Sequence, residues 1–316
     1  MEWIDCVRWC HRNEDQASVD ELIESLTDLR MRSCYSNPIL AKTQREQGVY
    51  AAGYLVLYPG ALASVGNLKS ESRDNDDREN ELLATLTREL FQAAFDSGAE
   101  MIQAISPLIT SQVSKESELA FVSPDPRRDE ILRGAGMQPV AKLVQMECFG
   151  LPTVLGLGIP SIGEESLELA LVLHHDLQSK QWSQLVESTY VDTRDVPELN
   201  GQRDIQNTLE GYASTICGRP ETWWAVQCQG ANIGCLLLTP TAAKWQELTY
   251  LGLVPEWRGK GLSKVVMNFV RDWALENGTQ GFTLAVDIRN TPAIRLYQSY
   301  GFETQGFVQA WICFSK

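Results

Sequence analysis

The sequence predicts an α/β protein of the α+β kind, built from two similar units that each hold a mixed, mainly antiparallel sheet flanked by helices. Three observations support this. The chain has 316 residues, enough for two domains of ordinary size. Its last 75 or so residues alternate strand-like and helix-like patterns around a glycine-rich turn. A weaker copy of this order occurs about 165 residues earlier, with Gly136 matching Gly301.

The C-terminal pattern is the clearest. Residues 245–254 (WQELTYLGLV) predict a strand, and the apolar residues after Gly261 recur on one helical face until Asn277 and Gly278 end the helix. Residues 281–288 (GFTLAVDI) predict a buried strand. A second helix follows, with Thr291 as N-cap, Pro292 in its first turn and Gly301 as its end.

The N-terminal half repeats this order less distinctly. ELLATLTRELFQAAFDSGAEMIQAIS predicts helix, turn and strand, and DEILRGAGMQPVAKLVQMECF predicts a short helix, a glycine and a last strand. Residues 150–166, rich in Gly and Pro, predict a linker. We therefore expect domains at 1–149 and 167–316.

Composition narrows the classes of function. The formal charge of -14 and pI near 4.7 argue against a broad nucleic-acid or anionic-membrane surface. The eight cysteines are scattered without a C-x-x-C pair, which predicts reduced thiols and no metal site. The start shows no signal peptide, and no apolar run is long enough to span a bilayer, so we expect a cytoplasmic protein.

The segment VPEWRGKGLS, residues 254–263, predicts an anion site where a strand passes into a helix. Glycines allow a tight turn with accessible N–H groups, and helix N-termini attract anions. Arg258, Lys260 and Lys264 add positive charge locally. A phosphate of a cofactor fits this pattern.

LGLVPEWRGKGLS, followed by N-x-x-A-x-x-L-Y-x-x-x-G-F from Asn290 to Phe302, resembles the GNAT superfamily of acyl-CoA-dependent N-acetyltransferases. The family signature R/Q-x-x-G-x-G/A is matched by Arg258 and Gly261, with Ser263 in place of the usual Gly or Ala. The tandem arrangement and the stretch from Glu247 to Gly261 are similar to the mycothiol synthase family. The resemblance implies acetyl-CoA as co-substrate.

The resemblance also implies roles for individual residues. Tyr297 would protonate the CoA sulfur, and the N–H of Leu253 would donate to the developing oxyanion. Glu247 would be the general base, with Asp287 as a weaker alternative. Leu253 and Val254 would pair with the pantetheine arm. The remaining expected contacts to the co-substrate are Arg258, Gly259, Lys260, Gly261, Leu262, Ser263 and Asn290.

The first copy lacks these features. Residues 67–80 (NLKSESRDNDDREN) occupy the place of the turn without a glycine, and their acidic residues would repel a pyrophosphate, so we expect a solvated loop. Leu132 stands where Tyr297 would be. The N-terminal unit is therefore expected to be non-catalytic.

Three functions remain open at this point. The first is transfer of an acetyl group from acetyl-CoA to a small-molecule primary amine, by direct attack in a ternary complex. The second is acetylation of a peptide N-terminus or lysine. The third, of another class, is a non-catalytic acyl-CoA sensor. No nucleic-acid, membrane or metal partner is expected, and the sequence leaves the oligomeric state undefined.

Overall fold

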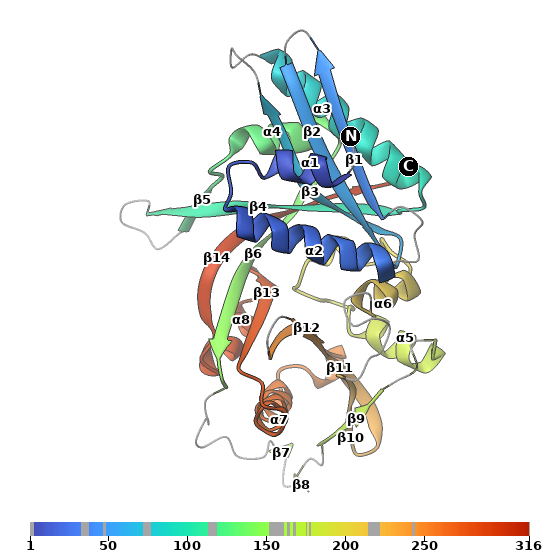
Figure 1. Cartoon of the computed structure of the whole chain (residues 1–316). Coiled ribbons are helices and arrows are strands. Elements are labelled where there is room, and N and C mark those ends of the chain that lie inside the picture. Colours follow the sequence, from blue (N-terminus) through green and yellow to red (C-terminus); the bar gives the residue numbers. More distant parts are fainter. Residues whose placement is uncertain are drawn as a thin grey trace. The chain divides into compact units, whose positions relative to one another are not determined.

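The computed structural model divides the chain into two compact units (Figure 1). It describes residues 3–32, 38–46, 49–71, 77–112, 119–151, 161–162, 165–166, 169–174, 176, 178–213, 222–241 and 244–315. Unit 1 comprises residues 1–141 and 308–316, and unit 2 comprises residues 142–307. Each unit is described by itself below.

Unit 1 begins with two helices and continues as a meander. The elements are α1 (Trp3–Cys10), α2 (Gln16–Arg32), β1 (Ile39–Glu46), β2 (Val49–Tyr58), β3 (Leu62–Glu71), α3 (Asp77–Asp96), β4 (Met101–Gln112), β5 (Leu119–Val122) and α4 (Pro126–Gly134). The strand order is β1-β2-β3-β4, and then the C-terminal part of β14 (Glu303–Phe314). All neighbours for which a register is defined pair antiparallel, except the short parallel contact of β3 with β4.

Unit 2 repeats this plan. Its first strand is the larger part of β6 (Gln138–Phe149). The elements that follow are β7 (Ser161–Ile162), β8 (Glu165–Ser166), β9 (Leu169–Leu173), α5 (Lys180–Ser188), the 3-10 turn η1 (Pro197–Leu199), α6 (Ile205–Ala213), β10 (Trp223–Cys228), β11 (Ala231–Pro240), β12 (Trp245–Leu253), the 3-10 turn η3 (Pro255–Trp257), α7 (Leu262–Asn277), β13 (Gly281–Asp287) and α8 (Thr291–Ser299). The strand order is β6-β13-β12-β11-β10-β9.

The two units show the same local devices, which supports the predicted internal repeat. Each has a bulge in its central hairpin, between Tyr54 and Leu55 in one and between Leu237 and Leu238 in the other. Each has a parallel strand pair only three residues long, β3 with β4 and β12 with β13. Each then places a helix, a left-handed glycine and a long strand in succession, through Gly136 (φ 99°) and Gly301 (φ 81°).

The compact units do not follow the linear division at residues 149 and 167. Residues 142–149 of β6 belong to unit 2, where Leu143 to Phe149 pair antiparallel with β13. Residues 308–316 belong to unit 1, where Trp311 is 1% exposed and its indole N–H donates to Ser106 Oγ at 3.2 Å. Each unit is thus completed by a strand from the other half of the sequence. Most of the expected linker, residues 152–160, lies outside the described residues.

Helices cover both faces of the unit 2 sheet. One core lies between the sheet and helices α7 and α8, centred on Val266, Val270 and Tyr300. A second core joins α5 and α6 to the other face through Trp182, Leu209 and Trp223. This layering leaves the end of β12 between the two helical layers, where the candidate site forms.

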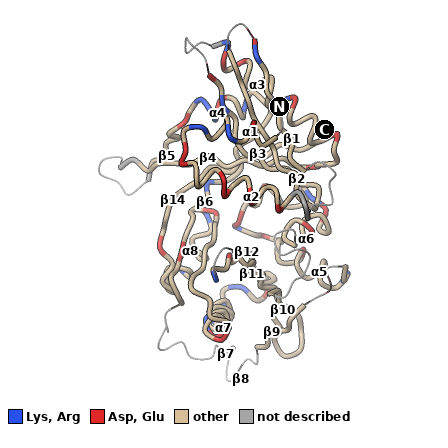
Figure 2. Tube along the Cα trace, viewed as in Figure 1, with Lys and Arg blue, Asp and Glu red and all other residues tan. Residues whose placement is uncertain are grey.

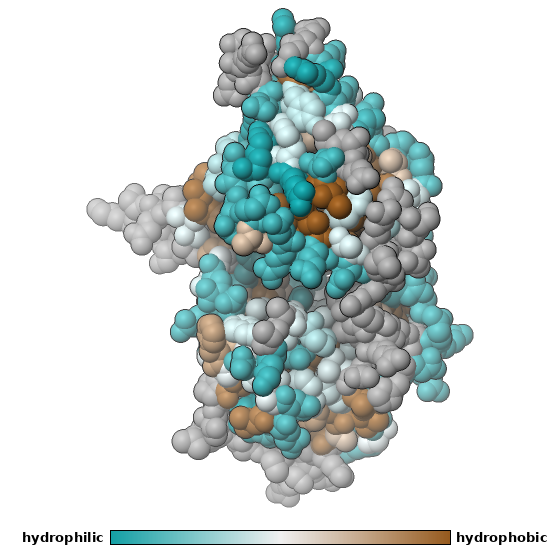
Figure 3. Space-filling model, in the orientation of Figure 1, coloured by the Kyte–Doolittle hydropathy of each residue, from teal (hydrophilic) through white to brown (hydrophobic). Residues whose placement is uncertain are grey.

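The surface is mixed in character. Figure 2 shows Lys and Arg dispersed among Asp and Glu in each unit. On the face drawn in Figure 3, apolar residues form separate spots among hydrophilic ones. No helix in the described ranges is long and apolar enough to cross a membrane. Six cysteines of the described chain are free thiols, while Cys34 and Cys217 lie outside it.

Candidate active site

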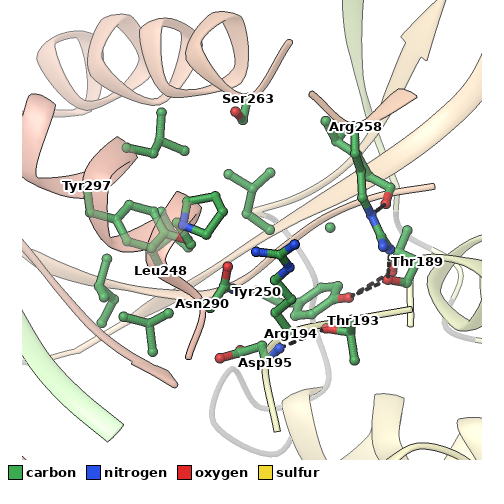
Figure 4. A pocket seen from close by; sticks show the side chains of 18 of the residues that line it. Thr189, Thr193, Arg194, Asp195, Leu248, Tyr250, Arg258, Ser263, Asn290 and Tyr297 are labelled. Carbon is green, nitrogen blue, oxygen red and sulfur yellow. Dashed lines mark hydrogen bonds between the residues drawn. The ribbon is translucent and has the colours of Figure 1, made fainter. Parts of the chain in front are cut away.

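A cavity of about 510 Å³ opens within unit 2 beside the end of β12 (Figure 4). This volume lies within the range of small-molecule sites. Of the residues predicted from the sequence, Leu253, Arg258, Gly259, Ser263, Asn290 and Tyr297 line it. Glu247, Val254, Lys260, Gly261 and Leu262 are not among the lining residues. The structure therefore brings the predicted acid and part of the predicted cradle to one space.

The cavity exists because β12 and β13 separate. Their parallel pairing covers only Trp245 to Glu247, opposite Gly281 to Thr283. Beyond this point the two strands diverge, and their backbone groups have no ladder partner on the facing side. Such free edge groups can accept an extended ligand.

The N–H of Leu253 points into this gap. Leu253 opposes Gly234 of β11, and the next residue, Val254, donates its N–H to Ile233 O at 2.9 Å. Bonded and non-bonded pairs alternate in an antiparallel ladder, so the N–H of Leu253 faces away from β11, toward β13. This geometry supports the predicted donor role of Leu253. The N–H of Val254, in contrast, is already engaged and cannot bind pantetheine as expected.

The glycine turn forms a run of unpaired donors. Gly259 (φ 71°) and Gly261 (φ 77°) are left-handed, and Gly261 is the N-cap of α7. Within the described chain, none of the five N–H groups from Gly259 to Ser263 donates a backbone hydrogen bond. A Cβ added at either glycine would meet nothing within 4 Å, so the space beside both glycines is open. An anion such as a pyrophosphate fits this cradle.

The guanidinium of Arg258 is bound to the backbone beside the cavity. It donates to three backbone carbonyls, with Nε 2.8 Å from Leu253 O, one terminal nitrogen 2.9 Å from Thr189 O and the other 3.1 Å from Asp192 O. The sequence predicts that Arg258 contacts a phosphate of the co-substrate. In the structure, three of its five N–H groups join β12 to the turn after α5.

Tyr297 lies buried at the wall of the cavity. Its side chain is 6% exposed, and its ring packs at 5.6 Å from that of Phe302. The hydroxyl makes no hydrogen bond with the described residues, and Tyr297 lines the cavity. Burial, and secondarily the charge of Asp195, raises the Tyr297 pKa, which keeps the phenol protonated.

Asn290 replaces Thr291 as the N-cap of α8, because its backbone turns before Thr291 enters the helix. Its side chain makes no capping hydrogen bond and lies at the cavity wall in Figure 4. This leaves the amide available to a ligand.

The two carboxylates considered as bases differ sharply. Glu247 is half-buried on β12, next to the cavity-lining Leu248, and burial raises its pKa. Asp287 is fully buried, and it accepts the Val196 N–H and several donors of Arg289, which also pairs with Glu198. Asp287 is thus occupied as a structural anchor.

Sequence reasoning missed the turn after α5. Thr189, Asp192, Thr193, Arg194 and Asp195 line the cavity, although they lie some 60 residues before the glycine turn. Their only local sign is a run of polar residues after a helix, which is common in loops.

Unit 1 lacks the corresponding chemistry at the residues that the structure describes. Glu79, expected to be solvated, is 3% exposed, accepts the Ser70 hydroxyl and pairs with Arg127 at 2.9 Å. The ion pair with Arg127 compensates the Glu79 carboxylate for the loss of its hydration. Leu132, the counterpart of Tyr297, is fully buried in the core. Residues 72–76 of the expected loop lie outside the described residues.

The cavity lies within a segment that matches a known family. Residues 181–302 match the model of the acetyltransferase (GNAT) family, and this range contains every residue that lines the cavity. This segment is a GNAT acetyltransferase domain. This match indicates an acyltransferase activity for the segment, and the GNAT acetyltransferases generally use acetyl-CoA. No functionally curated protein matches the chain.

Solved structures support the GNAT fold. A functionally unknown conserved protein from Staphylococcus epidermidis has a TM-score of 0.50 at 11% identity, over 87% of this chain and 95% of its own. A fungal GCN5-related glucosamine N-acetyltransferase region also has 0.50 at 11%, over 91% of this chain and 34% of its own. A tandem GNAT protein from the clavulanic acid pathway has 0.47 at 13%, over 99% and 93%. At such identities, likeness shows the fold alone.

Proposed function

We propose that unit 2 transfers an acetyl group from acetyl-CoA to a primary amine by direct attack in a ternary complex. The observation that carries this proposal is the convergence of the Leu253 N–H, the donors of the glycine turn and the Tyr297 hydroxyl on one cavity. A hydrolase or a simple binding module does not need an oxyanion donor, a phosphate cradle and a general acid around one cavity.

The N–H groups from Gly259 to Ser263 would hold the pyrophosphate, and the free groups along the β12 gap would align the pantetheine arm. Asn290 offers an amide at the far wall. The arrangement fixes the thioester relative to Leu253, which lowers the entropy cost of attack.

In the transfer, the amine nitrogen bonds to the thioester carbonyl carbon and the carbon–sulfur bond breaks. The Leu253 N–H donates to the carbonyl oxygen as negative charge develops there. Glu247 takes the proton released by the amine, through water, since its side chain is not among the lining residues. Tyr297 gives a proton to the leaving thiolate.

Calorimetric titration of acetyl-CoA into the full chain tests the proposal, followed by measurement of CoA thiol release with primary amines. One site per chain and amine-dependent release are expected. Two sites would contradict the proposal that unit 1 is non-catalytic and binds no co-substrate, whereas no binding would exclude acetyl-CoA as the co-substrate.

A further inference from the structure

Two charged side chains in the cavity have no part in the proposed transfer. Arg194 and Asp195 lie in the turn between α5 and α6 and line the same space as Leu253 and Tyr297. They are consecutive in sequence, yet no ion pair joins them. Opposite charges are thus presented side by side to whatever occupies this part of the cavity.

The Asp195 carboxylate is held firmly on one side. Its Oδ1 accepts the backbone N–H of Asp287 at 2.8 Å, and its own N–H donates to Thr193 Oγ1 at 3.1 Å. No other hydrogen bond to this carboxylate comes from the described residues, so Oδ2 remains available. Burial is the main cause that raises the pKa of Asp195.

Arg194 is equally without a partner. Its side chain forms no hydrogen bond or ion pair with the described part of the chain, whereas the other cavity-lining arginine, Arg258, has all three nitrogens engaged. Figure 4 shows the Arg194 guanidinium extending into the middle of the cavity, between Asn290 and Tyr250. A planar guanidinium placed this way suits a carboxylate, which it can bind through two parallel hydrogen bonds.

The proposed phosphate cradle at the start of α7 borders the same cavity, and its own N–H groups supply the donors for an anion. Arg194 is therefore left to the acceptor. The backbone around it is also strongly constrained, since Asp192 (φ 51°) and Val196 (φ 42°) flank the pair in left-handed conformations that non-glycine residues seldom adopt.

We propose that Arg194 and Asp195 form a two-point receptor for an acceptor that carries an anionic group beside its amine, as a small amino acid does. Asp195 binds the ammonium, and Arg194 binds the carboxylate. This inference rests on the proposed function and adds the chemical class of the acceptor. It predicts discrimination between an amino acid and the amine obtained by removing its carboxylate.

The test uses the full chain with saturating acetyl-CoA and measures CoA thiol release with three matched pairs: lysine and cadaverine, tyrosine and tyramine, serine and ethanolamine. In at least one pair, the amino acid is expected to have the higher kcat/KM, by about 10-fold, the usual effect of losing a charge-assisted contact. Arg194→Gln should raise KM for that amino acid and leave the decarboxylated partner unchanged. Asp195→Asn should raise KM for both.

Two controls keep these results specific. Arg295→Gln removes an exposed arginine of α8 that does not line the cavity, and it should change neither substrate. Calorimetry with acetyl-CoA should give the same affinity for Arg194→Gln as for the natural chain. A weaker affinity would place Arg194 on the co-substrate and overturn the receptor.

The remaining outcomes separate the two proposals. A higher kcat/KM for the decarboxylated amines would overturn the receptor. So would a KM that Arg194→Gln changes neither for the amino acids nor for the amines. Both outcomes would leave amine acetylation intact. Absence of thiol release with all six compounds, although acetyl-CoA binds, counts against both the receptor and the proposed transfer to amines.

Discussion

Arg258 closes the end of β12 by donating from Nε to the carbonyl of Leu253 at 2.8 Å. This bond fixes the end of the strand whose Leu253 N–H we propose to face the thioester. The other nitrogens of Arg258 extend this bridge to Thr189 and Asp192, at the start of the turn that carries Arg194 and Asp195. One side chain therefore ties the donor side of the cavity to the acceptor side.

Arg258→Lys should reduce both stability and turnover. A lysine cannot reproduce three directed hydrogen bonds, and charged hydrogen bonds contribute roughly 1.5–3 kcal/mol each at most. We expect a free energy of unfolding lower by about 2 kcal/mol in urea denaturation, with a higher KM for the amine. Arg295→Lys, at an exposed site of α8, is the control and should leave both unchanged.

Gly261→Ala and Gly278→Ala form a matched pair at the two ends of α7. Both glycines are left-handed, at φ 77° and 64°, and both have open space around an added Cβ. Each substitution should cost about 1 kcal/mol of stability through backbone strain. Only Gly261→Ala should also weaken acetyl-CoA binding in calorimetry, and an equal loss for Gly278→Ala would refute the cradle.

Tyr297→Phe should lower kcat by about 100-fold or more, in the range usual for loss of a general acid, while acetyl-CoA affinity is kept. Tyr300→Phe is the comparison, because the Tyr300 hydroxyl lies inside the fold, 2.7 Å from Lys264 O and 2.8 Å from Asn268 Oδ1, where its single O–H is shared between these two acceptors. That variant should lose stability and keep kcat. Full activity of Tyr297→Phe would remove the assigned acid.

Glu247→Gln should separate catalysis from stability by pH. Burial raises the Glu247 pKa above its usual value of 4.5, so the folded state binds the proton more tightly than the unfolded state. The free energy of unfolding of the natural chain should therefore fall as pH rises from about 4.5 through the folded pKa of Glu247. The variant, which has no carboxyl group at this position, should not show this fall. Urea denaturation across this window measures the difference, and kcat at neutral pH should fall in the variant.

Two fragments test how each unit is completed. A fragment of residues 165–316 lacks β6 and leaves the β13 edge unpaired, so we expect it to aggregate. A fragment of residues 142–307 keeps that strand and should be monomeric and bind acetyl-CoA. Equal behaviour of the two in gel filtration would show that β6 is dispensable.

The sequence by itself determined the local chemistry. The helix from Leu262 to Asn277, the strand from Trp245 and the left-handed glycines follow from spacing, caps and turn residues, which act over a few residues. The place of Tyr297 in the GNAT motif followed from the same short-range pattern.

Tertiary structure decided what lies opposite these residues. The exchange of β6 and β14, the engagement of Arg258 and the presence of Arg194 and Asp195 in the cavity all depend on contacts between segments far apart in the chain. Local propensity contains no information on such partners. They are set by which strand edges and cores become complementary once the units have formed.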